Sequence, residues 1–136
     1  MVLGIGTDLM RIDRLHPPYL REGDPFLAAT FTAAEIKAAA GQTDPYRFFA
    51  MRFCGKEAVF KALGLGPEHV RLSEIEILND ENGAPTVALF GSLKARAEAR
   101  GVERVLLSLT SDGGLAQAAA ISLGACGQTA GAEARP

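Results

Sequence analysis

The sequence predicts an α+β fold, and three observations carry that prediction. The chain opens with strand-like alternation, its middle third is rich in helix start and stop signals, and its second half returns to alternation in two hairpins. With 136 residues, 48% of them hydrophobic, the chain is large and apolar enough to bury the core of one domain. We expect that domain to cover residues 1–124 and residues 125–136 to form a flexible tail.

The leading strand is expected over residues 2–9. Alternation gives it an apolar face and a face of small residues that also carries Asp8. The apolar face holds Leu3, Ile5, Thr7 and Leu9, and the small face holds Gly4, Gly6 and Asp8. Bare backbone beside Asp8 leaves room for a ligand or a neighbouring chain. A carboxylate at a strand end also caps the following turn, and the strand alone does not separate the two interpretations.

Three helix starts follow. Asp24-Pro25 and Asp44-Pro45 each combine an N-cap with a proline at the first helical position. Thr32 and Glu35 form a capping-box pattern. The helix that starts at Pro45 is expected to be long and central and to end at Gly64.

This central helix is predicted to carry charge on both of its faces. One arc is aromatic and aliphatic, with Phe48, Phe49, Phe53, Val59, Phe60 and Leu63, and it includes Arg52 and Lys56. The other face has small residues, namely Ala50, Cys54, Ala58 and Ala62, together with Glu57 and Lys61. A cation facing a core needs an anionic partner or a path to water. The pattern suits phosphate with a divalent metal, although Glu57 and Lys61 also form an ordinary i,i+4 pair.

The second half is expected to contain two hairpins separated by a helix. The first pairs residues 74–77 with 86–90 across a turn at 79–83. Ser92 is expected to cap a short helix that Gly101 ends. The second hairpin pairs residues 104–109 with 115–123 across a turn over 111–114. The last segment is rich in alanine and would permit a helix, but the turn before it favours a strand.

Composition narrows the classes of function. A net charge of −2 argues against non-specific nucleic-acid binding, and no apolar run is long enough to cross a bilayer. Cys54 and Cys126 are expected to be free thiols, which fits a reducing cytoplasm, with Cys54 a core residue rather than a nucleophile. Arg11, Arg14 and Arg21 form an early basic cluster, which is either a solvated face or a docking site for an acidic protein.

Four motifs, in their order and spacing, resemble those of bacterial holo-acyl-carrier-protein synthases, in the 4′-phosphopantetheinyl transferase superfamily. The motifs are Gly4-Ile-Gly-x-Asp8, Phe31-Thr-x-x-Glu35, Arg52-Phe-x-x-Lys56-Glu57-Ala-x-x-Lys61-Ala-x-Gly64 and Asn79-Asp-x-Asn-Gly-x-Pro85. The resemblance runs from Met1 to about Leu123. It implies the fold of that superfamily and transfer of the 4′-phosphopantetheine arm of coenzyme A to a serine of apo acyl carrier protein. The implied reaction releases adenosine 3′,5′-bisphosphate, depends on Mg²⁺ and serves fatty acid biosynthesis.

The resemblance also implies roles for single residues. Asp8 and Glu57 are the expected Mg²⁺ ligands, Lys61 stabilises charge on the phosphates, and Glu57 is the expected base for the serine proton. Arg52 is assigned to the phosphates of the nucleotide, whereas Lys56 either binds substrate or pairs with an acidic neighbour. Arg14 and Arg21 are expected to dock the carrier protein. A homotrimer with sites at the subunit boundaries is implied.

The chain departs from the family at one position. Ser111 stands where the family usually has a histidine near the phosphates, so a hydroxyl replaces a group that carries charge. We expect Ser111 to line the substrate site of a working enzyme. Two other hypotheses remain: a non-catalytic homologue that binds coenzyme A or a nucleotide, and an oligomeric scaffold that binds an acidic protein through Arg11, Arg14 and Arg21.

Overall fold

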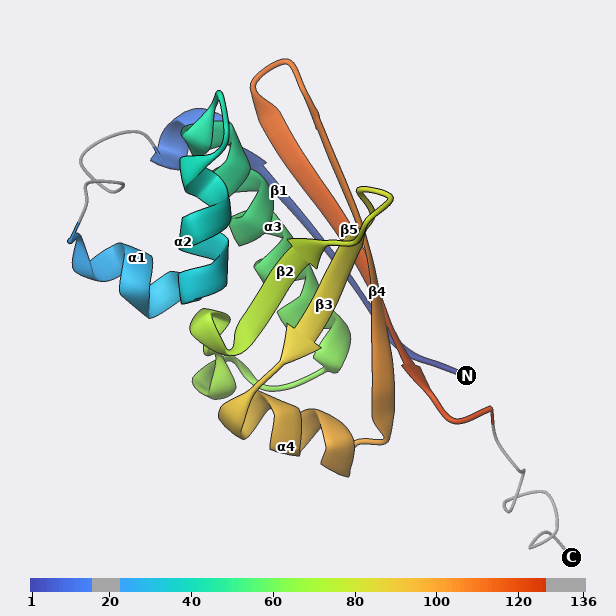
Figure 1. Cartoon of the computed structure of the whole chain (residues 1–136). Helices are drawn as coiled ribbons and strands as arrows, with labels where there is room; N and C mark the ends of the chain where they lie inside the picture. Colours follow the sequence, from blue (N-terminus) through green and yellow to red (C-terminus); the bar gives the residue numbers. More distant parts are fainter. Residues whose placement is uncertain (16–22, 127–136) are drawn as a thin grey trace, which may run out of the picture.

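A computed structural model describes residues 1–15 and 23–126 (Figure 1). The expected tail over residues 125–136 therefore lies almost wholly outside the described residues. In chain order the elements are β1 (Val2–Arg11), η1 (Ile12–Leu15), α1 (Pro25–Thr30), α2 (Ala33–Ala40), α3 (Pro45–Leu63), η2 (Pro67–His69), η3 (Leu72–Glu74), β2 (Ile75–Asn79), β3 (Pro85–Leu89), α4 (Gly91–Ala99), β4 (Val102–Asp112) and β5 (Leu115–Gly124). The α+β prediction is confirmed, with each expected helix and strand in its place.

The strands form two antiparallel sheets. In the larger one the leading strand lies beside the last, in the order β1-β5-β4, and β2 and β3 form a separate hairpin. The register places Asp8 opposite Ala118 and Leu109 opposite the same residue from the other side. Helix α3 lies between the three-stranded sheet and the β2–β3 hairpin (Figure 1). The long helix is thus the centre of the molecule.

The glycines of β1 allow the helix to lie directly on the strand. A Cβ atom at Gly6 would be 2.0 Å from the Ala58 carbonyl oxygen, and one at Gly4 would be 2.2 Å from that of Ala62. The small face of α3 therefore admits another element, as predicted. The bare backbone of β1 beside Asp8 is in contact with the chain's own helix at these two glycines, rather than with a ligand.

The observed helix caps confirm most of the helix boundaries predicted from the sequence. Asp24 and Asp44 accept hydrogen bonds from the first turns of α1 and α3, and Thr32 forms a capping box with Glu35. Gly64 ends α3 with φ of 70°, a left-handed conformation that favours glycine.

Two boundary predictions are wrong in detail. Ser92 does not cap α4, because the N-cap position is Phe90 and the carboxylate of Glu74 accepts the hydrogen bonds from Leu93 N and Ser92 Oγ, at 2.9 and 2.8 Å. Glu74, at the end of η3, therefore has the capping role that the sequence predicted for Ser92. Ser111 belongs to β4 rather than to a turn, since the reversal needs only two residues, Gly113 and Gly114, both with positive φ.

The core follows both faces of α3. The small residues Cys54 and Ala58 are fully buried against the sheet, and Phe49, Val59 and Phe60 are buried on the other side of the helix. The outer face of the sheet is different, because apolar side chains on it are exposed in the single chain; they are Leu3, Ile5, Leu9, Leu106 and Leu115. None of the helices in the described residues combines the length and the hydropathy needed to cross a membrane.

Candidate active site

Asp8, Glu57 and Lys61 meet at the β1 side of α3. Lys61 Nζ lies 3.3 Å from Asp8 Oδ1 and donates to the Thr7 carbonyl oxygen at 3.0 Å. Burial raises the pKa of Glu57, and the Asp8 carboxylate raises it further, while Lys61 acts in the opposite sense. The three side chains therefore share one electrostatic environment with one more negative than positive charge. We call them the carboxylate centre.

Cys54 lies directly beneath this centre. Its Sγ atom is 3.2 Å from the Asp8 carbonyl oxygen, and the side chain is fully buried. Burial raises the pKa of the thiol to about 12, with a further contribution from the Asp8 carboxylate. A thiol in that state is neither a nucleophile nor a metal ligand at neutral pH. This supports the interpretation of Cys54 as a core residue.

The carboxylate centre fits a hard divalent cation. Two carboxylates in mutual repulsion, one of them with a raised pKa, are relieved when a cation lies between them. Within residues 1–15 and 23–126 no three His, Cys, Asp or Glu side chains gather closely enough to enclose a metal. Mg²⁺ is commonly held by one or two carboxylates, with water and phosphate oxygens completing its octahedron. The donor set therefore suits Mg²⁺ shared with a phosphate.

Lys56 is in a different setting from Lys61, although both lie on α3. Its Nζ atom is 2.5 Å from Glu35 Oε1, and both side chains are completely buried. It also donates to the carbonyl oxygens of Leu72 and Ile75. Burial lowers the pKa of Lys56, and Glu35 opposes that change. Lys56 thus has the acidic neighbour that the sequence left as an alternative, and it presents no surface to a substrate.

Arg52 lies next to this pair, facing the β2–β3 hairpin. Its Nη2 atom donates to Asn79 Oδ1 at 3.2 Å, and its guanidinium lies 4.5 Å from the centroid of the Phe48 ring. The Nε atom is buried and has no hydrogen-bond partner among the described residues. Burial lowers the pKa of Arg52, with Glu35 opposing. Arg52 therefore keeps an unused donor where the hairpin turn meets the helix.

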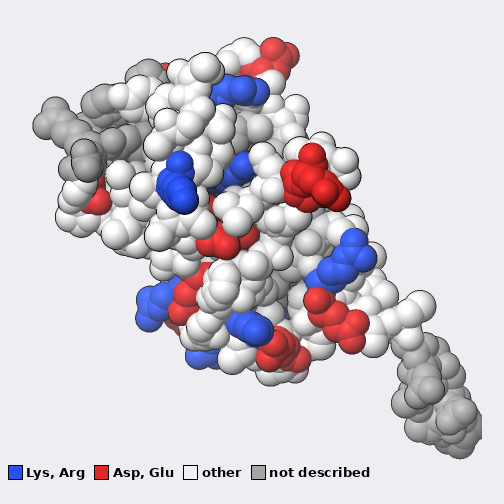
Figure 2. Space-filling view, viewed as in Figure 1, with Lys and Arg blue, Asp and Glu red and all other residues white. Residues whose placement is uncertain are grey.

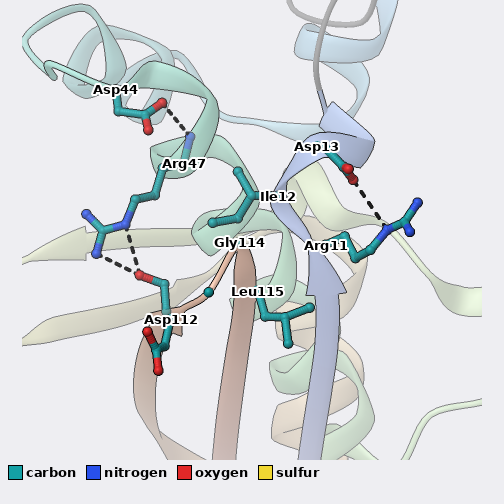
Figure 3. Close-up of a pocket in the computed structure, with 10 residues that line it drawn as sticks. Arg11, Ile12, Asp13, Asp44, Arg47, Asp112, Gly114 and Leu115 are labelled. Atoms are coloured by element: carbon teal, nitrogen blue, oxygen red, sulfur yellow. Dashed lines mark hydrogen bonds and ion pairs between the residues drawn. The ribbon is translucent and has the colours of Figure 1, made fainter.

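Ser111 is bound by Arg47, a residue that the sequence analysis did not single out. Arg47 Nε and Nη2 both donate to Ser111 Oγ, at 2.9 and 2.7 Å. Figure 3 shows the Arg47 guanidinium reaching from the first turn of α3 to β4, at the rim of a cavity of about 610 Å³. Arg11 lines the same cavity from β1 and pairs with Asp13 at 3.4 Å. A permanent positive charge therefore lies beside the Ser111 hydroxyl.

The basic cluster at the start of the chain is only partly described. Arg14 is exposed on η1 and lines a recess of about 290 Å³ together with Met10, Leu15, Phe26 and Phe53. Arg21 lies outside the described residues. On the face seen in Figure 2, acidic and basic side chains alternate and no large patch of one sign is present.

The structure thus brings Asp8, Glu57 and Lys61 together and separates them from Lys56 and Ser111. Sequence reasoning missed Arg47 and missed Glu35 as the partner of Lys56. Glu35 was noticed in the sequence, but its role in the capping box with Thr32 gave no reason to expect a second role as the partner of Lys56. Arg47 lies five residues before Arg52 on the same helix, and nothing in that spacing points to β4.

Comparison with known proteins finds relatives that match most of this chain. A sequence profile of the 4′-phosphopantetheinyl transferase superfamily matches residues 4–120. The holo-[acyl-carrier-protein] synthase of Desulforudis audaxviator is 43% identical over 124 residues, which cover 91% of this chain and 95% of that one.

Solved structures show the same architecture. The holo-[acyl-carrier-protein] synthase of Neisseria meningitidis superposes with a TM-score of 0.81 at 29% identity, covering 90% of this chain and 99% of that one. The Helicobacter pylori holo-[acyl-carrier-protein] synthase, solved in complex with coenzyme A, gives a TM-score of 0.72 at 25% identity, over 88% and 99% of the two chains.

Proposed function

Because this chain belongs to the 4′-phosphopantetheinyl transferase superfamily, we propose that it acts as a holo-acyl-carrier-protein synthase. It transfers the 4′-phosphopantetheine arm of coenzyme A to a serine hydroxyl of apo acyl carrier protein. The serine oxygen forms a bond to the phosphorus that bears the arm, and the bond to the bridging oxygen breaks, which releases adenosine 3′,5′-bisphosphate. The observation that carries this proposal is the meeting of Asp8, Glu57 and Lys61 at one edge of α3.

Asp8 and Glu57 would hold Mg²⁺, whose chemistry is to neutralise charge that develops on the diphosphate oxygens. Lys61 contributes a second positive charge from a fixed position, since its Nζ atom is bound to Asp8 and to the Thr7 carbonyl. Glu57 accepts the serine proton, directly or through water. A carboxylate whose pKa is raised is a better proton acceptor than an ordinary one, so burial and the Asp8 charge favour this role.

The 3′-phosphate of the nucleotide, which is not part of the diphosphate, is assigned to the opposite edge of the sheet. Arg47, held against Ser111, supplies the positive charge there, and the Ser111 hydroxyl proton remains free to be donated because its oxygen accepts both Arg47 bonds. Arg52 is proposed to add a positive charge from the side of α3 that faces the β2–β3 hairpin, where Asn79 holds its guanidinium. Lys56 has no proposed contact with substrate, because its partners are inside the fold.

This division supports a site completed between copies of the chain. Asp8 lies on β1 and Ser111 on β4, and these are the two edge strands of the sheet order β1-β5-β4, with α3 packed across it. The sheet also exposes Leu3, Ile5, Leu9 and Leu106 on its outer face, which a monomer would leave in water. We propose a homotrimer in which the β1 edge of one copy faces the β4 edge of the next. Sedimentation equilibrium of the full chain measures its stoichiometry directly.

The carrier protein would dock beside η1. Arg14 is exposed above an apolar recess, a combination that fits an acidic, amphipathic helix. Arg21 is proposed to extend this surface, in a segment outside the described residues. The place of action is proposed to be the cytoplasm, where the free thiols Cys54 and Cys126 would stay reduced.

A direct transfer assay tests the proposal. The purified chain is mixed with apo acyl carrier protein, coenzyme A and Mg²⁺, and the carrier is weighed by mass spectrometry. We expect the mass to rise by one phosphopantetheine group and expect no rise when EDTA is present. Lys61→Met keeps a side chain of similar length without its charge and should slow the transfer.

A second function, coenzyme A binding without catalysis, is considered because Ser111 lacks the charge of the family's histidine. Coenzyme A binding by calorimetry, run beside the transfer assay, separates the two. If the chain binds coenzyme A and modifies no apo carrier from its own source, it is a non-catalytic coenzyme A-binding homologue. The presence of Arg47 beside Ser111 favours the enzyme.

A further inference from the structure

Ser122 is a buried hydroxyl that lies outside the carboxylate centre. It belongs to β5, the central strand of the larger sheet, and only 1% of its surface is exposed. Its Oγ atom donates to the carbonyl oxygen of Ala62 at 2.7 Å. Ala62 is in the last turn of α3, where a carbonyl lacks the amide that would bind it in the interior of a helix. Ser122 therefore connects the end of the central helix to the middle of the sheet.

The hydrogen bond occupies a gap that Gly4 leaves open. Gly4 lies opposite Ser122 in the pairing of β1 with β5. A Cβ atom at Gly4 would be 3.1 Å from Ser122 Oγ and 2.2 Å from the Ala62 carbonyl oxygen. One hydroxyl thus lies where β1, β5 and the last turn of α3 meet. The bond that it makes fixes the position of this turn relative to both strands.

Lys61 directly precedes Ala62, so its position depends on this turn. Its ammonium group binds the Thr7 carbonyl oxygen at 3.0 Å and Asp8 Oδ1 at 3.3 Å, and both partners lie on β1. The Lys61 side chain is 52% exposed and has a flexible four-carbon stem, so packing does not hold it in one place. The place of the ammonium group is therefore set by the position of its turn against β1.

We propose that Ser122 is a positioning residue for arm transfer, an inference that rests on the proposed function. It holds the last turn of α3 where Lys61 reaches Asp8. Without the hydroxyl, the Ala62 carbonyl is buried and unpaired, and the turn opens locally to find another donor. Lys61 then shifts relative to Asp8, and its charge no longer lies where the phosphates need it during the reaction.

A double-mutant cycle separates positioning from a purely structural role. Ser122→Ala should lower kcat for arm transfer by about tenfold, within the range that a small misplacement of a catalytic group produces. In a chain that carries Lys61→Met, the same substitution should lower kcat by less than about twofold, because the group through which Ser122 acts is gone. A purely structural role would lower kcat by the same factor in both backgrounds.

The reactivity of the lysines gives a second readout, which needs no transfer. Brief acetylation of the full chain with acetic anhydride is followed by mass spectrometry, with the exposed Lys37 and Lys94 as internal references. In Ser122→Ala the labelling rate of Lys61 should rise, because its amine is less often bound to Asp8 and more often open to the reagent. The rates of Lys37 and Lys94 should stay at their native values.

Glu74→Ala is the matched control. It also removes hydrogen bonds to a helix end, at the start of α4, and should change neither kcat nor the labelling of Lys61. Ser122→Cys replaces the hydroxyl with a weaker donor and should give smaller changes of both kinds than Ser122→Ala. Circular dichroism must show the native fold for each variant used. If Ser122→Ala does not fold, Ser122→Cys carries the cycle and the labelling.

The outcomes separate this inference from the proposed function. Equal losses of kcat in the two backgrounds would overturn it, and so would native labelling of Lys61 in the folded Ser122 variants. If the native chain modifies no carrier, the proposed function fails, and the labelling alone then decides. Faster labelling of Lys61 in that case supports Ser122 as the residue that positions it, and an unchanged rate refutes that role.

Discussion

Helix α3 carries two lysine–carboxylate pairs in opposite environments. Lys56 and Glu35 are completely buried, and backbone groups from other segments complete their hydrogen bonds. Lys61 and Asp8 are 3.3 Å apart at the surface, with the lysine side chain half exposed and a second carboxylate, Glu57, beside them. The first pair is neutral as a whole and has its partners inside the protein. The second group has an excess of negative charge, for which the described part of the chain supplies no further positively charged partner.

This difference separates charges that hold the fold from charges that are available for chemistry. An ion pair that is enclosed and fully bonded resists change, because the loss of either member leaves an uncompensated buried charge. A cluster with unbalanced like charges is destabilised when the protein is alone and is relieved by a bound cation. The predictions below test that distinction, in order of decreasing effect.

The buried pair should dominate stability. Glu35→Gln leaves Lys56 charged in the interior and turns an amide group toward Ile77 N, which donates to the Glu35 carboxylate at 3.0 Å. We expect a loss of about 3–5 kcal/mol in the free energy of unfolding. Urea denaturation followed by circular dichroism measures it. Replacing both members, with Glu35→Leu and Lys56→Met, should recover much of the loss, and a double variant no better than the single one would contradict the interpretation.

The carboxylate centre should behave in the opposite way. Glu57→Gln is expected to lower kcat for arm transfer by about 10²–10³-fold, the scale seen when a group that stabilises the transition state is removed. The pKa of Glu57 is raised in the folded chain, so its carboxylate destabilises the fold above that pKa and has no such effect below the ordinary value for glutamate.

The stability of the same variant is therefore a second readout. At pH 7 and without metal, Glu57→Gln should melt at or slightly above the temperature of the native chain, and the gain should vanish as the pH falls toward 4. Mg²⁺ should raise the Tm of the native chain more than that of the variant. A clear loss of stability at pH 7 would place Glu57 with the structural charges instead.

Arg47 is a third kind of cation, because it is neither buried like Lys56 nor part of the carboxylate centre. Arg47→Met removes both hydrogen bonds to Ser111 and should weaken adenosine 3′,5′-bisphosphate binding by about tenfold, as expected for a charge-assisted contact at an exposed site. Ser111→Ala keeps the arginine and should cost less. Fluorescence competition with a labelled nucleotide gives both affinities, and equal losses would show that the Arg47 charge contributes no more to binding than the Ser111 hydroxyl.

The smallest effect should come from a charge that only caps a helix. Glu74 accepts hydrogen bonds from Leu93 N and Ser92 Oγ at the start of α4. Glu74→Ala should cost about 1 kcal/mol of stability, the usual value for a lost cap, with no change in arm transfer. Ser92→Ala should cost less than that. Thermal melts of the two variants rank them, and the reverse ranking would restore Ser92 as the cap.

Most of the fold was predictable because its signals are local. Caps such as Asp44-Pro45, the left-handed stop at Gly64 and the alternation of the strands act within a few residues, and each lies where expected. The exceptions are long-range. Glu74 caps a helix that begins seventeen residues later (Gly91), and no pattern near Ser92 reveals it. The pairing of the first strand with the last is likewise invisible in local sequence.

The residues of the candidate site also divide into those that could be predicted from the sequence and those whose partners lie far away in the chain. Asp8, Glu57 and Lys61 were identified from motifs, and the structure brings them together. The helical pattern correctly placed Arg52 and Lys56 toward the interior, but periodicity along one helix does not show which acid comes from elsewhere to meet them. Glu35 does so from α2. Arg47 was missed for a similar reason, since its partner lies 64 residues away on β4.

The glycines of β1 give the carboxylate centre its dimensions. Because Gly6 meets the backbone of α3 at Ala58 without a side chain between them, the spacing between the strand that carries Asp8 and the helix that carries Glu57 is set by main-chain atoms alone. No rotamer change can widen it. A methyl group at Gly6 would therefore force the strand and the helix apart. The two carboxylates would separate and bind a cation more weakly, although no charged residue had been replaced.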